Sequence, residues 1–329
     1  PQSQLVIALE EEYKEDMDLI FSFLSLAYDH ESVYYIRQNY ESGTTEGIGY
    51  AVELLDMLID ETIKPFLFPL FEDNSDYDKI KNLQIEFPVE IQKLPDALYT
   101  ILSSDMNQLG EYARVLALRE LMKYNNLKIT QSIVAQAFHP SRIIRESAFA
   151  LILKYDPDII QGILKRLNKN IAEELSTFIV CQNESGCAGE WKKLNSLLNS
   201  EVLSCIKRKN LVALAKKSVI TGIKKDDNVC FREIFNNNEI ALSVEGKISF
   251  TKNDNKEIKA GNDLMFLTSE FFKHKLENLI LNIKIDTSII KISEDDLREF
   301  IFDNETEGKN LVTRIAENHN TLLKKFIAK

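Results

Sequence analysis

The stretch that decides the fold of the first half is His139-Pro-Ser-Arg-Ile-Ile-Arg-Glu-Ser-Ala-Phe-Ala-Leu-Ile-Leu-Lys-Tyr-Asp-Pro157. Its apolar residues recur at helical spacing, and a proline stands near each end, which is typical of helix boundaries. Within it, Arg145-Glu-Ser-Ala148 matches Arg114-Val-Leu-Ala117 at an offset of 31 residues. The same offset pairs Lys123-Tyr124 with Lys154-Tyr155. Self-similarity at such a period predicts repeated helical units that stack on one another.

This segment resembles the second helix of a HEAT repeat. In that family a turn with Pro leads to a Val/Ile-Arg pair, then to an Ala, then to a Leu-rich face. Small residues at Ala51, Ala117 and Ala148 let two helices approach closely, and Ala51 lies in an earlier, more degenerate copy. The resemblance implies a HEAT-like α-solenoid over residues 1–205. An irregular helical bundle stays open as the alternative.

Outward from this segment, the first half of the chain is predicted to be helical throughout. Apolar residues from Gln4 to Tyr28 recur with a period near 3.6, which predicts one long helix. Short breaks with Gly, Asn or Pro separate further amphipathic segments. These segments are expected at 32–41, 44–60, 62–71, 76–84, 95–103, 108–124, 127–138, 140–154, 156–167, 169–182 and 188–200. No catalytic constellation occurs among them.

Composition and charge agree with a helical protein that does not bind nucleic acid. The chain has 11 Gly and 7 Pro in 329 residues, too few for a turn-dense all-β protein. Residues 1–200 hold 18 basic and 31 acidic side chains, whereas residues 201–329 hold 22 and 20. An acidic surface repels phosphates. The basic residues at 207–209, 216–217 and 224–225 are expected to contact the acidic half, with anionic lipid or a partner as the alternative.

Segments for targeting or membrane insertion are not found. The most apolar run, Pro65–Phe71, is too short for a span, and the N-terminus is acidic rather than basic. Four cysteines without a CxxC pair indicate a reducing compartment, where buried thiols are expected. We therefore expect a cytoplasmic location, including the inner face of the membrane. Because residue 1 is Pro, the chain is expected to be a piece of a longer polypeptide, with any membrane tether outside it.

The pattern changes to strands near residue 218. Short β-rich runs occur at 219–223, 228–231, 239–244, 247–251, 279–285 and 288–292, with turns at 224–227, 236–238 and 252–255. Two helices follow, from the N-cap Ser293 to about 303 and from about 307 to 327. The fold class is therefore mainly α, with a C-terminal α+β module at 206–329. Its antiparallel β-roll is expected at about 218–292 and its closing helices at about 293–328.

The module carries a family resemblance. Leu211–Ser218, Ile223–Glu233 and Glu239–Ser249 look like the first half of a cyclic nucleotide-binding domain, in which a helix precedes a basic turn, an "FxEG" corner and a hairpin. Asp286–Leu297 resembles that family's last strand and the start of its closing helix. The resemblance rests on order and spacing across about residues 205–328. It implies a phosphate cassette, in which helix-end N–H groups and an Arg hold a cyclic phosphate.

The cassette is degenerate in this chain. Where the family has Gly before its Glu this chain has Ser269, the family's Arg falls close to Glu277, and Ile234 replaces the corner Gly. An acid in place of an Arg removes the phosphate ligand and repels the phosphate, so cyclic nucleotide binding is not expected. We expect Phe271, Phe272 and Leu276 to fill the nucleotide's space. The candidate ligand-binding residues implied by the resemblance are Gly261, Asp263, Ser269, Glu270, Lys273, Lys275 and Glu277.

The function expected from these features is a non-enzymatic regulatory or protein-interaction module. No catalytic residue, metal site or cofactor is assigned, and His139 is interpreted as a turn residue. The expected partner is a protein or the rest of a longer chain. The chain is similar to a bacterial family that places these two modules behind a transporter resembling ATP/ADP translocases or major facilitators. The alternative is a small-ligand sensor, in which a cyclic nucleotide in the β-roll signals to the helical array.

Overall fold

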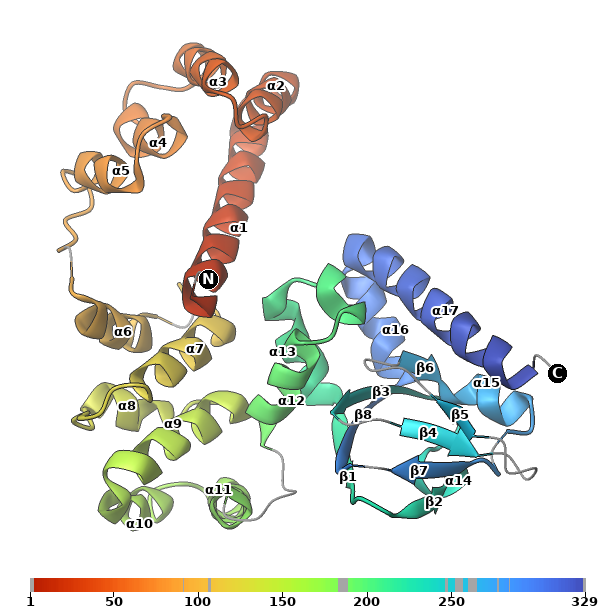
Figure 1. Ribbon diagram of the computed structural model, residues 1–329. Coiled ribbons are helices and arrows are strands. Elements are labelled where there is room, and N and C mark those ends of the chain that lie inside the picture. The colour runs from red at the N-terminus through yellow and green to blue at the C-terminus, as the bar shows by residue number, and fades with distance from the viewer. Residues whose placement is uncertain are drawn as a thin grey trace. The chain divides into compact units, whose positions relative to one another are not determined.

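The computed structural model describes residues 3–90, 92–105, 108–182, 189–245, 248–251, 257–259, 265–276, 278–283 and 285–327. The chain forms two compact units, Pro1–Ala97 and Leu98–Lys329 (Figure 1). The fold is mainly helical with an antiparallel α+β module in the C-terminal part, as predicted. The sequence division at 205/206 lies inside the second unit, where helices give way to strands. That it separates two independently folding domains stays a prediction.

The N-terminal unit is helical. Side chains of Ser3, Asp29, Thr44 and Ser75 accept hydrogen bonds from backbone N–H groups in the first turns and so begin four of its helices. Its core is mostly aliphatic and includes a pair of aromatic rings: Phe21 meets Phe71 edge-on with 5.3 Å between ring centroids. The helices are α1 (Gln4–Ala27), α2 (His30–Glu41), α3 (Thr45–Leu58), α4 (Lys64–Phe71) and α5 (Asp76–Leu83), and α6 (Leu94–Ser103) crosses into the second unit.

The second unit begins with the helices that carry the repeat pattern. They are α7 (Glu111–Leu121), α8 (Gln131–Gln136), α9 (Arg142–Tyr155), η1 (Pro157–Ile159), α10 (Ile160–Leu164), α11 (Lys169–Gln182), α12 (Glu190–Leu198), η2 (Val202–Cys205) and α13 (Arg208–Lys217). Every residue of α9 from Ile143 to Ile152 is buried, which makes it the central helix of this part. Ala117 and Ala148 are fully buried, and so is Ala51 in the N-terminal unit, as predicted for close helix contacts. Assignment of these helices to HEAT-like repeats stays a prediction.

Eight described strands form two four-stranded antiparallel sheets. They are β1 (Val219–Ile223), β2 (Asn228–Cys230), β3 (Glu239–Glu245), β4 (Ile248–Thr251), β5 (Glu257–Lys259), β6 (Met265–Leu267), β7 (Ile280–Ile283) and β8 (Thr287–Ser293). The strand orders are β1-β8-β3-β6 and β2-β7-β4-β5. Strands adjacent in sequence thus lie mostly in different sheets, which is the arrangement of a jelly roll. The predicted β-roll is therefore present.

Helices complete the α+β module. Two short ones, α14 (Phe231–Ile234) and α15 (Thr268–Lys273), lie between strands, and α16 (Glu294–Asp303) and α17 (Glu305–Ile327) close the chain. The Ser293 hydroxyl accepts from the N–H of Asp296 at 3.0 Å, which confirms the predicted N-cap. In the turn at 236–238, Asn238 adopts a φ of 75°, a left-handed conformation that Asn tolerates. The predicted turn at 252–255 lies outside the described residues.

Some local predictions are wrong. Helices α7 and α8 are shorter than the segments 108–124 and 127–138, and β5 and β6 were not predicted, because three-residue strands carry too little periodicity to detect. The thiols of Cys205 and Cys230 are half-buried rather than buried. The basic residues divide between two partners: Lys216 Nζ lies 2.6 Å from Glu111 Oε2 on α7, whereas Lys217 Nζ lies 2.7 Å from Glu299 Oε2 on α16.

Candidate functional site

The predicted cassette residues that the structure describes gather on and just after one short helix. Ser269, Glu270 and Lys273 belong to α15, and Lys275 follows it with a φ of 55°. The other three candidates, Gly261, Asp263 and Glu277, lie outside the described residues. The structure therefore brings four of the predicted residues into one place, directly after β6.

Hydrogen bonds of Thr268, the first residue of α15, connect this helix to β3. This side chain is fully buried, and its hydroxyl lies 2.7 Å from the carbonyl oxygen of Asn236 and 2.9 Å from that of Glu239. It also accepts a hydrogen bond from the N–H of Glu239 at 2.9 Å. Because buried polar atoms need partners, this one hydroxyl sets where α15 begins. The hydroxyl of Thr268 therefore stabilises the fold, and its hydrogen bonds are made within the protein.

Charged side chains around α15 are paired with one another. The Ser269 hydroxyl donates to Glu294, whose carboxylate lies 3.6 Å from the guanidinium of Arg298 on α16. Glu270 lies 3.3 Å from Lys273 Nζ and 3.7 Å from His274 Nε2. A bound phosphate here would meet two negative charges, while the nearby Lys273 and Arg298 are exposed and already paired. Each of these two cations thus already has a carboxylate neighbour.

An aromatic stack fills the module beneath α15. The ring of Phe271 is fully buried and lies parallel to that of Phe231 on α14, with 5.0 Å between centroids and 7° between planes. Phe266 on β6 lies 5.1 Å from Phe271, and the partly buried Phe272 and Leu276 pack against the same cluster. Offset stacking of this kind adds to the stability from burial. Helix α15 thus buries the side chain of Phe271 in the hydrophobic core.

His319 joins this core from α17 and was missed by sequence reasoning. Its Nδ1 accepts from the N–H of Leu267 at 3.4 Å, and its ring lies 6.1 Å from that of Phe271. Burial lowers the pKa of His319, and Glu270 opposes this effect. The available signal was its helical position, four residues after Ile315 and three before Leu322, both of which are buried.

A second polar cluster, also missed, lies between helices α9 and α12 of the second unit. Glu146 on α9 accepts from Arg142 Nε at 2.7 Å and from the N–H of Glu190 on α12 at 2.6 Å. Burial raises the pKa of Glu146, and the bond from Arg142 offsets part of this. A Cβ on Gly189 would come within 2.8 Å of the Glu146 carboxylate, so the chain needs Gly at this approach. The cluster joins α9 to α12.

The described residues were also compared with the requirements of a metal site and of a membrane-spanning helix. Across the described residues, no group of three or more His, Cys, Asp or Glu side chains is arranged to hold a metal ion. His139 fills its predicted place in the turn before α9, where its Nδ1 accepts from the N–H of Ser141 at 3.0 Å. Within the part of the chain that the structure covers, the helices are too short or too polar to span a bilayer.

Comparison with known proteins adds structural neighbours only. No family model matches the chain, and no curated protein matches it. Similar solved structures include the sensor domain of the transcriptional regulator DNR from Pseudomonas aeruginosa, with 11% identity and a TM-score of 0.30 over 38% of this chain and 91% of that one. A cyclic nucleotide-binding domain from Methylobacillus flagellatus KT has 13% identity and a TM-score of 0.31, over 40% and 79%. The regulatory subunit of a cAMP-independent protein kinase A from Trypanosoma brucei has 13% identity and a TM-score of 0.30, over 39% and 44%.

Proposed function

We propose that this chain is a non-enzymatic regulatory module that acts through protein contacts, with a C-terminal domain of the cyclic nucleotide-binding type that has lost its ligand. The observation that carries the proposal is the buried stack of Phe271 on Phe231. In a nucleotide-binding module, the side of the cassette that faces the roll has to leave room for a ligand. Here that side supplies an aromatic ring to the core, so the module is complete without one.

Charge supports the same proposal. The Ser269 hydroxyl donates to Glu294, and the nearby cations Lys273 and Arg298 pair with Glu270 and Glu294, so a phosphate at the start of α15 would have to displace existing interactions. The sequence resemblance and the jelly-roll strand order support membership of the fold type. The finer part of the hypothesis, a HEAT-like array attached to a transporter-like protein at the inner face of a membrane, rests on the resemblance alone.

A sensor is the second candidate, and one contact favours it. His319 on the closing helix α17 accepts from the backbone of Leu267, the last residue of β6 before α15. A ligand that moved α15 would therefore also move α17. In a module without a ligand, the same contact simply packs α17 against β6. The two candidate functions therefore make different predictions only about ligand binding.

Isothermal titration of the full chain with cyclic AMP and cyclic GMP tests the proposal. We expect no saturable heat with either nucleotide, for the wild type and for the double variant Glu277→Arg with Ser269→Gly. The double variant restores the arginine and the glycine of the family pattern, while the aromatic stack remains. Micromolar binding by the wild type would establish the sensor instead. Micromolar binding by the double variant alone would show an open site that lacks only its phosphate ligand, which also contradicts the filled-pocket argument.

A further inference from the structure

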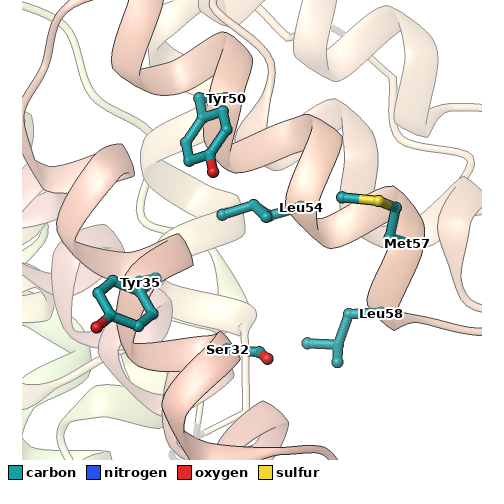
Figure 2. A pocket seen from close by; sticks show the side chains of 6 residues that line it. All are labelled: Ser32, Tyr35, Tyr50, Leu54, Met57 and Leu58. Atoms are coloured by element: carbon teal, nitrogen blue, oxygen red, sulfur yellow. The ribbon is translucent and has the colours of Figure 1, made fainter.

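A pocket of about 410 Å³ lies between α2 and α3 in the N-terminal unit (Figure 2). This size is typical of sites that take a small ligand or a few side chains. Four of its lining residues come from α3 and two from α2, and five of the six are aromatic or aliphatic. The lining residues are Ser32, Tyr35, Tyr50, Leu54, Met57 and Leu58.

The pocket borders the core of this unit, against which its lining residues Leu54 and Leu58 pack. The core sides of α2 and α3 carry Ile36, Ala51 and Leu55, all fully buried. The pocket uses a second apolar stripe, in which Tyr50 and Met57 lie seven residues apart and are 52% and 75% exposed. Tyr35 on α2 is 49% exposed opposite them. Clustered exposed apolar residues of this kind mark interaction surfaces on soluble domains.

Three acidic residues stand one helical turn from residues that line the pocket. Glu31 precedes Tyr35 by four residues, Glu46 precedes Tyr50 by four, and Glu53 lies between Tyr50 and Met57 at helical-neighbour spacing. All three carboxylates are exposed. The ion pairs that the structure describes in this unit use other acids: Arg37 pairs with Asp18 and Glu41, and Lys64 pairs with Asp56 and Glu61.

The N-terminal unit as a whole is also strongly acidic. Residues 1–97 contain 21 acidic and 6 basic side chains, a net charge of −15, whereas the chain as a whole carries −11. A field of one sign steers oppositely charged partners toward a surface and repels like-charged ones. A second copy of this unit and an anionic membrane are both negative, so charge opposes either as the occupant. A cationic partner is favoured.

We propose that the groove between α2 and α3 binds a basic amphipathic helix of a partner protein. The apolar face of that helix enters the pocket between Tyr35, Tyr50 and Met57, and its lysines or arginines pair with Glu46 and Glu53. A helix laid in a groove between two helices is a common recognition mode, with anchors spaced three or four residues apart. The inference deepens the proposed function, since it identifies a surface through which a protein-interaction module acts.

The test uses the full chain and defined peptides as probes. A fluorescein-labelled amphipathic peptide of Leu and Lys is titrated in fluorescence anisotropy, beside a matched peptide with Glu in place of every Lys and a scrambled peptide of the same composition. We expect the basic amphipathic peptide to bind and the other two to bind at least about tenfold more weakly. A photo-crosslinker on the apolar face of the peptide is expected to attach within residues 32–58.

Variants separate the groove from general charge attraction. Tyr50→Lys and Met57→Lys change exposed side chains and are each expected to weaken binding at least about tenfold. The matched control Leu26→Lys alters an apolar side chain on α1 that is 83% exposed and is expected to change binding less than about twofold. The pair Glu46→Gln with Glu53→Gln is expected to weaken binding and reduce its salt dependence, and Glu86→Gln with Glu90→Gln is the charge-matched control.

Three results would overturn the inference. One is absence of binding by the basic peptide, and another is an equal loss in groove and control variants, which would indicate attraction to net charge alone. The third is a dimer that Tyr50→Lys dissociates in analytical ultracentrifugation, which would assign the groove to a second copy. Cyclic nucleotide affinity is measured separately. It would overturn the ligand-free function without changing the peptide result.

Discussion

Arg114 and Arg145 occupy equivalent places 31 residues apart, and each ties its helix to the turn that precedes it. Arg114 on α7 donates to the carbonyl oxygen of Leu102 at the end of α6 and to those of Ser104, Asp105 and Leu109 in the connection to α7, at distances from 2.6 to 3.3 Å. Arg145 on α9 donates to those of His139 and Pro140 at 3.0 and 2.6 Å. Both side chains are buried. A guanidinium is suited to this role because its donors fan out in one plane and stay charged.

Loss of one of these arginines should therefore destabilise the second unit. Arg145 also lies 2.9 Å from Glu174 on α11, so Arg145→Ala removes several charge-assisted bonds and leaves that acid with only Arg142, whose Nε is 3.6 Å away. We expect a loss of about 2–4 kcal/mol in the free energy of unfolding. Urea unfolding followed by the fluorescence of Trp191, the single tryptophan, measures it, because this residue lies in α12 of the same unit.

Lys169→Ala is the control for this prediction. The side chain of Lys169 is 87% exposed, and its Nζ lies as far as 3.9 Å from Glu173. Its removal should therefore change the free energy of unfolding by less than about 0.5 kcal/mol. Equal stability of Arg145→Ala and Lys169→Ala would show that the buried arginine does not hold the turn.

Close helix contact at Ala148 predicts a penalty for a larger side chain. Because Ala148 is fully buried in the central helix, Ala148→Leu should cost about 1–3 kcal/mol through overpacking. Ala213→Leu on α13 places the same side chain at an exposed helical position and should be nearly neutral. The comparison is made by thermal unfolding monitored at Trp191. A neutral shift for Ala148→Leu would count against the repeat alignment.

Removing the ring of Phe271 should unfold the β module more readily. Phe271→Ala empties space beneath Phe231 and Phe266, and large-to-small changes of this type cost about 3–5 kcal/mol. Phe302→Ala, at a position that is 86% exposed, is the matched control and should be within about 0.5 kcal/mol of wild type. Hydrogen exchange of peptides from the module measures the effect directly. Unchanged protection in Phe271→Ala would mean that the stack does not support the fold.

The buried His319 predicts a dependence of stability on pH. Its pKa in the folded chain is lowered from the ordinary value of 6.5, chiefly by burial. In the window between the lowered pKa and 6.5, the unfolded chain takes up a proton that the folded chain does not. Stability is therefore full above about 6.5 and decreases as the pH falls through that value.

Urea midpoints at pH 7.5 and 5.5 test this dependence. His319→Gln keeps an acceptor for the Leu267 N–H but cannot be protonated, so its midpoint should fall less on acidification than that of the wild type. His139, whose pKa burial also lowers, remains in the variant and contributes a residual slope of the same sign. His30→Gln, at an exposed position, is the control. Identical slopes for wild type and His319→Gln would refute the assignment.

Local pattern was enough to predict most elements of this chain. The helical period between residues 4 and 28 predicted α1, and short β-branched runs predicted six strands, because both signals depend on neighbours a few residues apart. The burial of Ala51, Ala117 and Ala148 followed from the repeat comparison. Four of the predicted cassette residues lie on or just after one short helix, and their part in ligand binding stays a prediction.

Relationships between residues far apart in the sequence were decided only by the tertiary structure. The bond from the N–H of Glu190 to Glu146 joins positions 44 residues apart, and the approach of His319 to Leu267 joins positions 52 apart. The division into units at Ala97–Leu98 and the apolar pocket between α2 and α3 are of the same kind. Periodicity reveals which side of a helix is apolar, but it does not say what covers that side. Burial of Phe271 and exposure of Tyr50 are consequences of long-range packing, in which the same type of side chain takes opposite roles.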